Sequence, residues 1–119
     1  MDKAGWKKKI KKSTEEAGTY RPFFDSVIDT LADIMAKRDS VQEKYESENG
    51  EPIVNHTNQH GATNLAQNPA LRLINDYNRD ALAYWRDLGL TPAGLRKIND
   101  KALVKEKKSA LAEALRAIG

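Results

Sequence analysis

Residues 68–98 read NPALRLINDYNRDALAYWRDLGLTPAGLRKI, and they carry the clearest helix start and stop signals in the chain. Asn68 is a good helix N-cap, and the proline that follows is tolerated because the first helical N–H has no partner inside the helix. Gly89 can adopt the left-handed conformation that ends a helix. Thr91 and the next proline repeat the start signal. The sequence therefore predicts a helix, a sharp turn and a short second helix that ends near residue 98.

Two long helices carry apolar stripes at helical spacing. The candidate packing residues are Phe24, Ile28, Leu31 and Met35 in residues 20–49, and Leu82, Trp85 and Leu88 in residues 69–88. Such stripes usually pack against a core or a partner helix, so we expect the two helices to pack antiparallel. Asp25, Asp29 and Asp33 share one face of the first helix, where we expect a solvated surface or an intersubunit contact.

Residues 50–67 break the helical pattern and read GEPIVNHTNQHGATNLAQ, which predicts an unusually long polar loop. Ile53, Val54 and Leu65 are compatible with a small β-hairpin inside it, and contact with DNA or a partner is the alternative role. His56 and His60 are four residues apart, but the first is not followed by glutamate and no cysteine or acidic ligand accompanies them. We therefore expect no metal and no cofactor.

The composition restricts the class of protein. A chain of 119 residues suggests one domain, and a content of 39% apolar and 31% charged residues indicates a thin core. The chain has no cysteine, which excludes disulfides and thiolate chemistry. No apolar run reaches the roughly 20 residues of a membrane helix. Phosphate-binding glycine loops and nucleophile motifs are also absent, so we expect a soluble, non-enzymatic protein without membrane contact.

The charge distribution is more informative than the net charge of +3. Residues 1–12 hold six lysines and one aspartate, residues 23–48 hold three basic and seven acidic residues, and residues 89–119 hold seven basic and three acidic residues. Basic ends around an acidic middle suggest contact with a polyanion, or with the acidic middle of a neighbouring subunit.

The two basic ends supply the candidate DNA-binding residues. Residues 1–20 are expected to be a basic N-terminal arm, either mobile or bound to DNA phosphates, in which Trp6 and Ile10 allow a short amphipathic helix that Trp6 anchors. Residues 99–119 are expected to form a separate basic helix capped by Asp100. The candidates are Lys7, Lys8, Lys9, Lys11, Lys12, Lys97, Lys101, Lys105, Lys107 and Lys108.

The predicted architecture is all-α, a long antiparallel helical hairpin followed by short C-terminal helices. Its parts are a basic arm (residues 1–20), a helical oligomerisation core (residues 21–98, with the loop at 50–67) and a basic C-terminal helix (residues 99–119).

The asparagine–proline helix start and the Leu-Gly-Leu-Thr-Pro turn at residues 88–92 resemble the signature of phage terminase small subunits. The resemblance is dense over residues 68–98, looser over 23–54 and weak before residue 20. It implies a ring assembled through the helical hairpin, which recognises double-stranded viral DNA and regulates a separate large ATPase/nuclease subunit in the cytoplasm of the bacterial host. By the same analogy, the C-terminal tail is the candidate contact with the large subunit.

One departure from the family pattern matters for DNA recognition. Many small terminases begin with a helix-turn-helix domain, and the twenty residues before residue 21 are too few to form one. The alternative reading is a helical interaction or regulatory module that dimerises without specific DNA recognition. DNA affinity, its salt dependence and the size of the assembly discriminate between the two.

Overall fold

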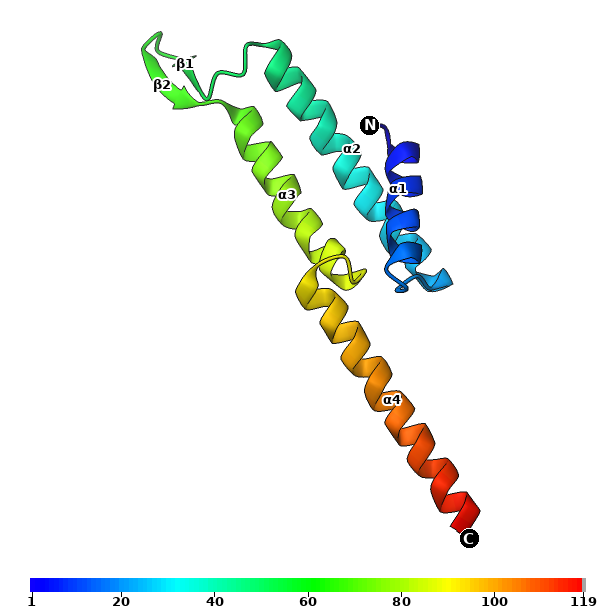
Figure 1. Cartoon of the computed structure of the whole chain (residues 1–119). Helices are drawn as coiled ribbons and strands as arrows, with labels where there is room; N and C mark the ends of the chain where they lie inside the picture. Colours follow the sequence, from blue (N-terminus) through cyan, green and yellow to red (C-terminus); the bar gives the residue numbers. More distant parts are fainter. Residues whose placement is uncertain (119) are drawn as a thin grey trace.

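The computed structural model describes residues 1–118, and it describes the side chains of these residues except 102–109 and 117–118. The chain is mainly helical, with one small two-stranded sheet (Figure 1). In order, the elements are α1 (Lys3–Glu16), the 3-10 helix η1 (Pro22–Phe24), α2 (Asp25–Ser47), β1 (Ile53–Thr57), β2 (Thr63–Gln67), α3 (Pro69–Asp87) and α4 (Pro92–Ile118).

Three helices build the core. Helices α2 and α3 run side by side in opposite directions, and α1 packs against α2 (Figure 1). The buried apolar cluster between them consists of Trp6, Ile10, Ile28, Leu31, Ala32, Met35, Ala81 and Leu88. The apolar stripes predicted for α2 and α3 supply half of this core, through Ile28, Leu31, Met35 and Leu88.

Helix α1 is the short amphipathic helix that Trp6 and Ile10 allow, and it packs against α2, so the alternative of a mobile arm is wrong, while its contact with DNA stays a prediction. Its N-terminus is capped by Asp2, whose Oδ1 accepts a hydrogen bond of 2.8 Å from the Gly5 N–H. Trp6, Ile10 and Thr14 repeat every fourth residue and are all buried. An isolated helix of this length is marginal in water, and the burial of this face is what stabilises it.

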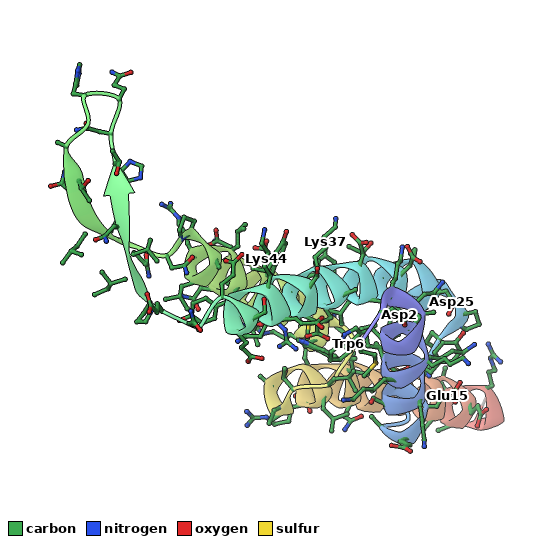
Figure 2. All side chains as sticks on the ribbon, turned by 90° about the horizontal axis from the view of Figure 1, so that it is seen from above. Asp2, Trp6, Glu15, Asp25, Lys37 and Lys44 are labelled. Carbon is green, nitrogen blue, oxygen red and sulfur yellow. The ribbon has the colours of Figure 1, made fainter. Side chains whose placement is uncertain are left out.

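The small β-hairpin between α2 and α3 confirms the prediction from residues 53, 54 and 65. Its strands pair antiparallel, with Val54 opposite Ala66 and Asn55 opposite Leu65. Asn58 closes the turn, because its Oδ1 accepts hydrogen bonds from the His60 and Ala62 N–H groups at 2.9 and 3.1 Å. The hairpin projects beyond the ends of the two helices (Figures 1 and 2).

The corner between α3 and α4 follows its sequence signals closely. Asn68 caps α3 through a 3.0 Å hydrogen bond from the Ala70 N–H, and Gly89 has a φ of +73° after the last turn. Thr91 caps α4, since its Oγ1 accepts a 3.0 Å hydrogen bond from the Gly94 N–H. Both helix starts were predicted correctly.

Helix α4 corrects the prediction of two short C-terminal helices. It runs without interruption over 27 residues, and Asn99 and Asp100 lie inside it, so Asp100 is not a cap. A polar pair without glycine or proline does not break a helix. The helix extends away from the other three, which gives the molecule dimensions of 85 × 26 × 20 Å (Figure 1).

Candidate nucleic-acid interface

The five candidate lysines of α1 are all exposed, because the face of the helix that carries Trp6 and Ile10 is turned toward α2. Helical geometry places Lys8 and Lys12 on the side opposite this buried face, with the other three at its borders. The Lys9 Nζ lies 5.1 Å from the centre of the Trp6 ring, and the Lys11 Nζ lies 5.2 Å from that of Tyr20. The two rings therefore make cation–π contacts with the ammonium groups of Lys9 and Lys11, which stay exposed to solvent.

Lys7 is engaged within the chain. The Nζ atoms of Lys3 and Lys7 each lie 3.2 Å from a carboxylate oxygen of Asp29 on α2. Hydrogen bonds from Lys7 and then Lys3 hold the pKa of the Asp29 carboxyl below its ordinary value of 3.8. This acidic side chain therefore offsets part of the positive charge on the border of α1.

Replacing Asp29 by asparagine should remove one acid-sensitive contribution to stability. The folded protein depresses this pKa, so the carboxylate contributes stability above the ordinary value of 3.8, and the contribution is lost as the pH falls through the folded pKa. Urea unfolding across this range should show a wild-type advantage near neutral pH that shrinks on acidification. Replacing the exposed Glu113 by glutamine is the control. An advantage for the wild type that does not change with pH would contradict the assigned ion pairs.

The other two aspartates of the α2 stripe also have partners within the chain. Asp25 accepts a 2.8 Å hydrogen bond from the Tyr20 hydroxyl, and Asp33 lies 2.8 Å from the Lys37 Nζ. The stripe is exposed to solvent, as expected, since the side chains of Asp29 and Asp33 are 46% and 42% exposed, and α1 and local side chains form surface pairs with its carboxylates. The Asp33–Lys37 pair has the i,i+4 spacing that the sequence can indicate, whereas the hydrogen bond between Tyr20 and Asp25 depends on the fold.

A cleft of about 320 Å³ separates α1 from the beginning of α2. Lys7, Lys8 and Lys11 line one side, while Asp25 and Ile28 line the other. Cations therefore outnumber carboxylates around this cleft.

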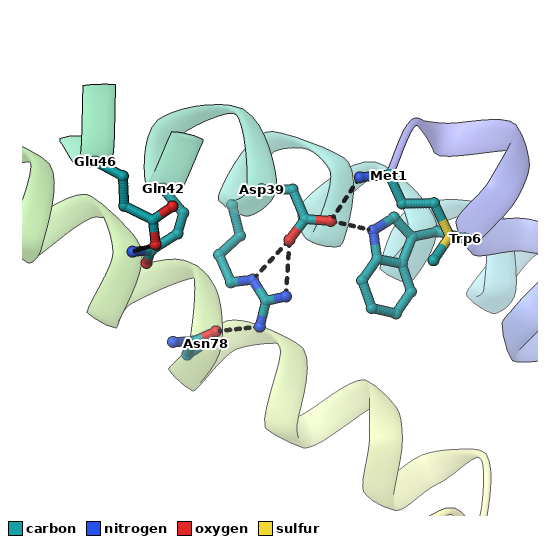
Figure 3. A network of polar contacts seen from close by, with 7 residues as sticks. Met1, Trp6, Asp39, Gln42, Glu46 and Asn78 are labelled. Atoms are coloured by element: carbon teal, nitrogen blue, oxygen red, sulfur yellow. Dashed lines mark hydrogen bonds and ion pairs between the residues drawn. The ribbon is translucent and has the colours of Figure 1, made fainter. Parts of the chain in front are cut away.

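Asp39 fixes α1 in place and was not singled out in the sequence (Figure 3). Its Oδ2 accepts hydrogen bonds from the Trp6 Nε1 at 2.7 Å and from the Met1 amino group at 3.2 Å, and its Oδ1 accepts one of 2.8 Å from the Arg38 Nη2. Arg38 also donates to the Asn78 Oδ1 of α3 at 3.3 Å. Directly and through Arg38, the Asp39 carboxylate thereby links α1, α2 and α3. Nothing in the sequence distinguishes it from the other acidic residues of α2.

The corner brings the second basic segment to the same end of the molecule as the C-terminus of α1. The buried Thr19 hydroxyl, just after α1, donates a 2.8 Å hydrogen bond to the Leu88 carbonyl oxygen. The neighbouring Gly89 lies against both Thr19 and Ile98 of α4. Lys97 and Lys101 line a cavity of about 240 Å³ next to this contact. The side chains of the other three candidates, Lys105, Lys107 and Lys108, lie outside those that the structure describes.

The candidate packing residues fall into three groups. Ile28, Leu31, Met35 and Leu88 are buried, whereas Phe24 and Trp85 are half-buried against the core. Leu82 is 47% exposed, so it lies outside the core of the single chain, and its contact with a neighbouring copy stays a prediction. The apolar side chains of α3 occupy a wider face of the helix than α2 of the same chain covers. The fully packed tryptophan is Trp6, which meets Trp85 edge to face at 6.4 Å.

The two histidines lie on the exposed hairpin, His56 in β1 and His60 in the turn. Among the residues that the structure describes, no three His, Cys, Asp or Glu side chains gather into a group that could hold a metal ion. No helix within residues 1–118 is long and apolar enough to cross a membrane.

Comparison with known proteins agrees with the resemblance seen in residues 68–98. A family model described as "Phage terminase, small subunit" matches residues 3–105, which span α1, the hairpin, α3 and much of α4. Comparisons with curated proteins and with solved structures found no match. Because the family match covers most of the chain, this protein belongs to the phage terminase small subunit family.

Proposed function

We propose that this protein is the DNA-recognition and regulatory component of a viral packaging machine. In this role it binds double-stranded viral DNA, assembles with copies of itself into a ring and recruits or regulates a large subunit that carries the ATPase and nuclease. It carries out no catalysis itself and acts in the cytoplasm of the bacterial host. Family membership supports the packaging role, and the charge distribution supports the contact with DNA.

The observation that carries the DNA contact is the separation of charge along the molecule. The exposed cations of α1 and of the first turns of α4 lie toward the α3–α4 corner. The opposite end, where α2 runs into the hairpin, carries Glu43, Glu46, Glu48 and Glu51. A DNA phosphate chain attracts the first surface and is repelled by the second.

The proposed assembly is supported by apolar side chains that the single chain leaves in solvent. Phe23 is 73% exposed in η1, just before α2, and Leu73 and Leu82 are exposed on α3. Helices of one copy can cover these side chains on the next. Helices α2 and α3 therefore remain our candidates for the main oligomerisation surface.

The quadruple variant Lys8→Ala, Lys9→Ala, Lys11→Ala and Lys12→Ala should bind duplex DNA more weakly and with a shallower salt dependence. Removing one lysine–phosphate interaction lowers the slope of log K against log salt by about 0.9. Fluorescence anisotropy at several salt concentrations measures both quantities. Lys7 is left intact because it bonds to Asp29, so the substitutions spare this ion pair between α1 and α2.

The control removes two exposed lysines from α2, Lys37 and Lys44. Both variants should retain the wild-type assembly, measured by light scattering during size exclusion. Equal DNA affinity and slope for the quadruple variant and the wild type would remove α1 from the DNA interface. A dimeric wild type that binds no DNA would instead favour a helical interaction module.

A further inference from the structure

The hairpin has an unusual composition for a protein in which 31% of residues are charged. No Asp, Glu, Lys or Arg occurs between Glu51 and Arg72. Sheet edges in natural proteins are commonly protected from other strands by lysine, proline or a covering element. Neither strand here contains a charged residue or a proline. Both edges of this sheet therefore lack the usual protection.

The register shows which backbone groups face outward. The Asn58 N–H donates to the Ala62 carbonyl oxygen, and the Asn68 N–H donates to the Pro52 carbonyl oxygen. Hydrogen-bonded pairs alternate along an antiparallel ladder, so the bonds inside the hairpin fall at every second pair. The N–H and C=O groups of the remaining residues point away from the partner strand. These residues are Ile53, Asn55 and Thr57 on β1, and Thr63, Leu65 and Gln67 on β2.

The same hairpin exposes apolar area that one chain does not cover. Ile53 is 58% and Leu65 is 75% exposed, although β-strands normally bury such side chains. These two residues line a groove of about 420 Å³ together with Leu71 of α3. A lone two-stranded hairpin is at best marginally stable in water, and three or more strands with an apolar face are needed for independent stability.

We propose that the hairpins of neighbouring copies pair edge to edge, β2 of one copy with β1 of the next. This inference rests on the homo-oligomer proposed above and identifies a contact within it. The pairing continues the antiparallel order, so every hairpin in the assembly points the same way. A repeated contact of this head-to-tail kind closes into a ring when its rotation permits.

Charge favours a second copy as the occupant of this edge. The strands meet without any formal charge between them, so pairing desolvates no ion. Glu51 precedes β1, and Arg72 follows β2 in the first turns of α3. Antiparallel pairing of β2 with β1 of the next copy places Arg72 of one copy and Glu51 of the other at the same end of the two paired strands.

The variant Asn55→Pro tests the pairing. Proline removes the outward N–H of β1 and fills the edge with its ring, while the inward bonds of the hairpin remain. The control Asn55→Thr keeps the N–H and suits a strand. We expect Asn55→Pro to reduce the mass of the assembly in light scattering, or to raise the concentration at which it forms, with Asn55→Thr unchanged. The full chain is used, and its helical content is checked by circular dichroism.

Amide hydrogen exchange gives the second measurement. In the assembled wild type, the outward amides of Asn55 and Leu65 should exchange as slowly as the inward amides of the same strands, and Asn55→Pro should make the Leu65 amide fast. Fast exchange of the outward amides in the wild-type assembly would overturn the inference, as would an unchanged mass for the proline variant. DNA binding is titrated separately. An assembly that depends on these edges but binds no DNA refutes the proposed function and leaves the edge pairing intact.

Discussion

Replacing Trp6 by alanine should lower the free energy of unfolding by about 3–5 kcal/mol, the range seen when large buried aromatic side chains are truncated. Trp6 is 7% exposed and contacts the ring of Trp85 on α3. The substitution also removes the 2.7 Å hydrogen bond from the Trp6 Nε1 to Asp39. Because α1 buries only one short face, this single side chain supplies much of its attachment to α2.

Phenylalanine at the same position separates the two contributions. Trp6→Phe keeps most of the apolar area and loses the N–H donor, so the expected loss is about 1–2 kcal/mol, near the lower end for a hydrogen bond to a charged group. Chemical denaturation followed by circular dichroism measures both variants. Trp85→Ala should cost less than Trp6→Ala, since Trp85 is only half-buried. A larger loss for Trp85→Ala would mean that α1 contributes little to the core.

Replacing Gly94 by alanine should lower the free energy of unfolding by about 1–3 kcal/mol, the usual cost of overpacking, because it crowds the α3–α4 corner. A Cβ at this position would lie 2.2 Å from the Arg86 carbonyl oxygen and 2.9 Å from the Arg86 carbonyl carbon. Both are backbone atoms, so relief requires the two helices to separate. Alanine normally stabilises a helix interior by about 1 kcal/mol relative to glycine. A net loss would therefore show that the clash outweighs this propensity.

Gly5→Ala is the matched control for this variant. The new Cβ there would lie 2.6 Å from the Met1 Cγ, but that atom belongs to a flexible side chain that can rotate away. We expect the midpoint temperature of thermal unfolding of Gly5→Ala to equal or exceed that of the wild type. A Gly94→Ala variant as stable as Gly5→Ala would mean that α3 and α4 approach less closely than the structure shows.

The sequence predicts local features well here because their causes are local. The caps at Asn68 and Thr91, the left-handed Gly89 and the apolar stripes of α2 and α3 all act within a few residues of one another. The small hairpin was compatible with Ile53, Val54 and Leu65, although the polar composition of residues 50–67 favoured a loop. Helix α4 was wrongly divided because a polar Asn-Asp pair resembles a helix start when no tertiary contact is known.

The remaining features depend on residues that are far apart in the chain. Asp39 receives its hydrogen bond from Trp6 across 33 positions, and Asp29 pairs with Lys3 across 26. A pattern read along one segment cannot reveal such partners. For the same reason the lysines of α1 resembled a uniform basic arm, whereas the fold engages Lys7 with Asp29 and leaves Lys8 and Lys12 on the outer face.

Helix α4 extends away from the other helices at the α3–α4 corner, so a small rotation at this corner produces a large displacement at the far end of α4. Helix α4 has 27 residues, and a rise of 1.5 Å per residue makes it about 40 Å long. A rotation of roughly 10° at the corner would therefore move its far end by about 7 Å, with no change inside the helix itself. The close approach of Gly94 to Arg86 sets the angle from which such a movement starts. A small adjustment at one glycine can thus change how far the C-terminal helix reaches.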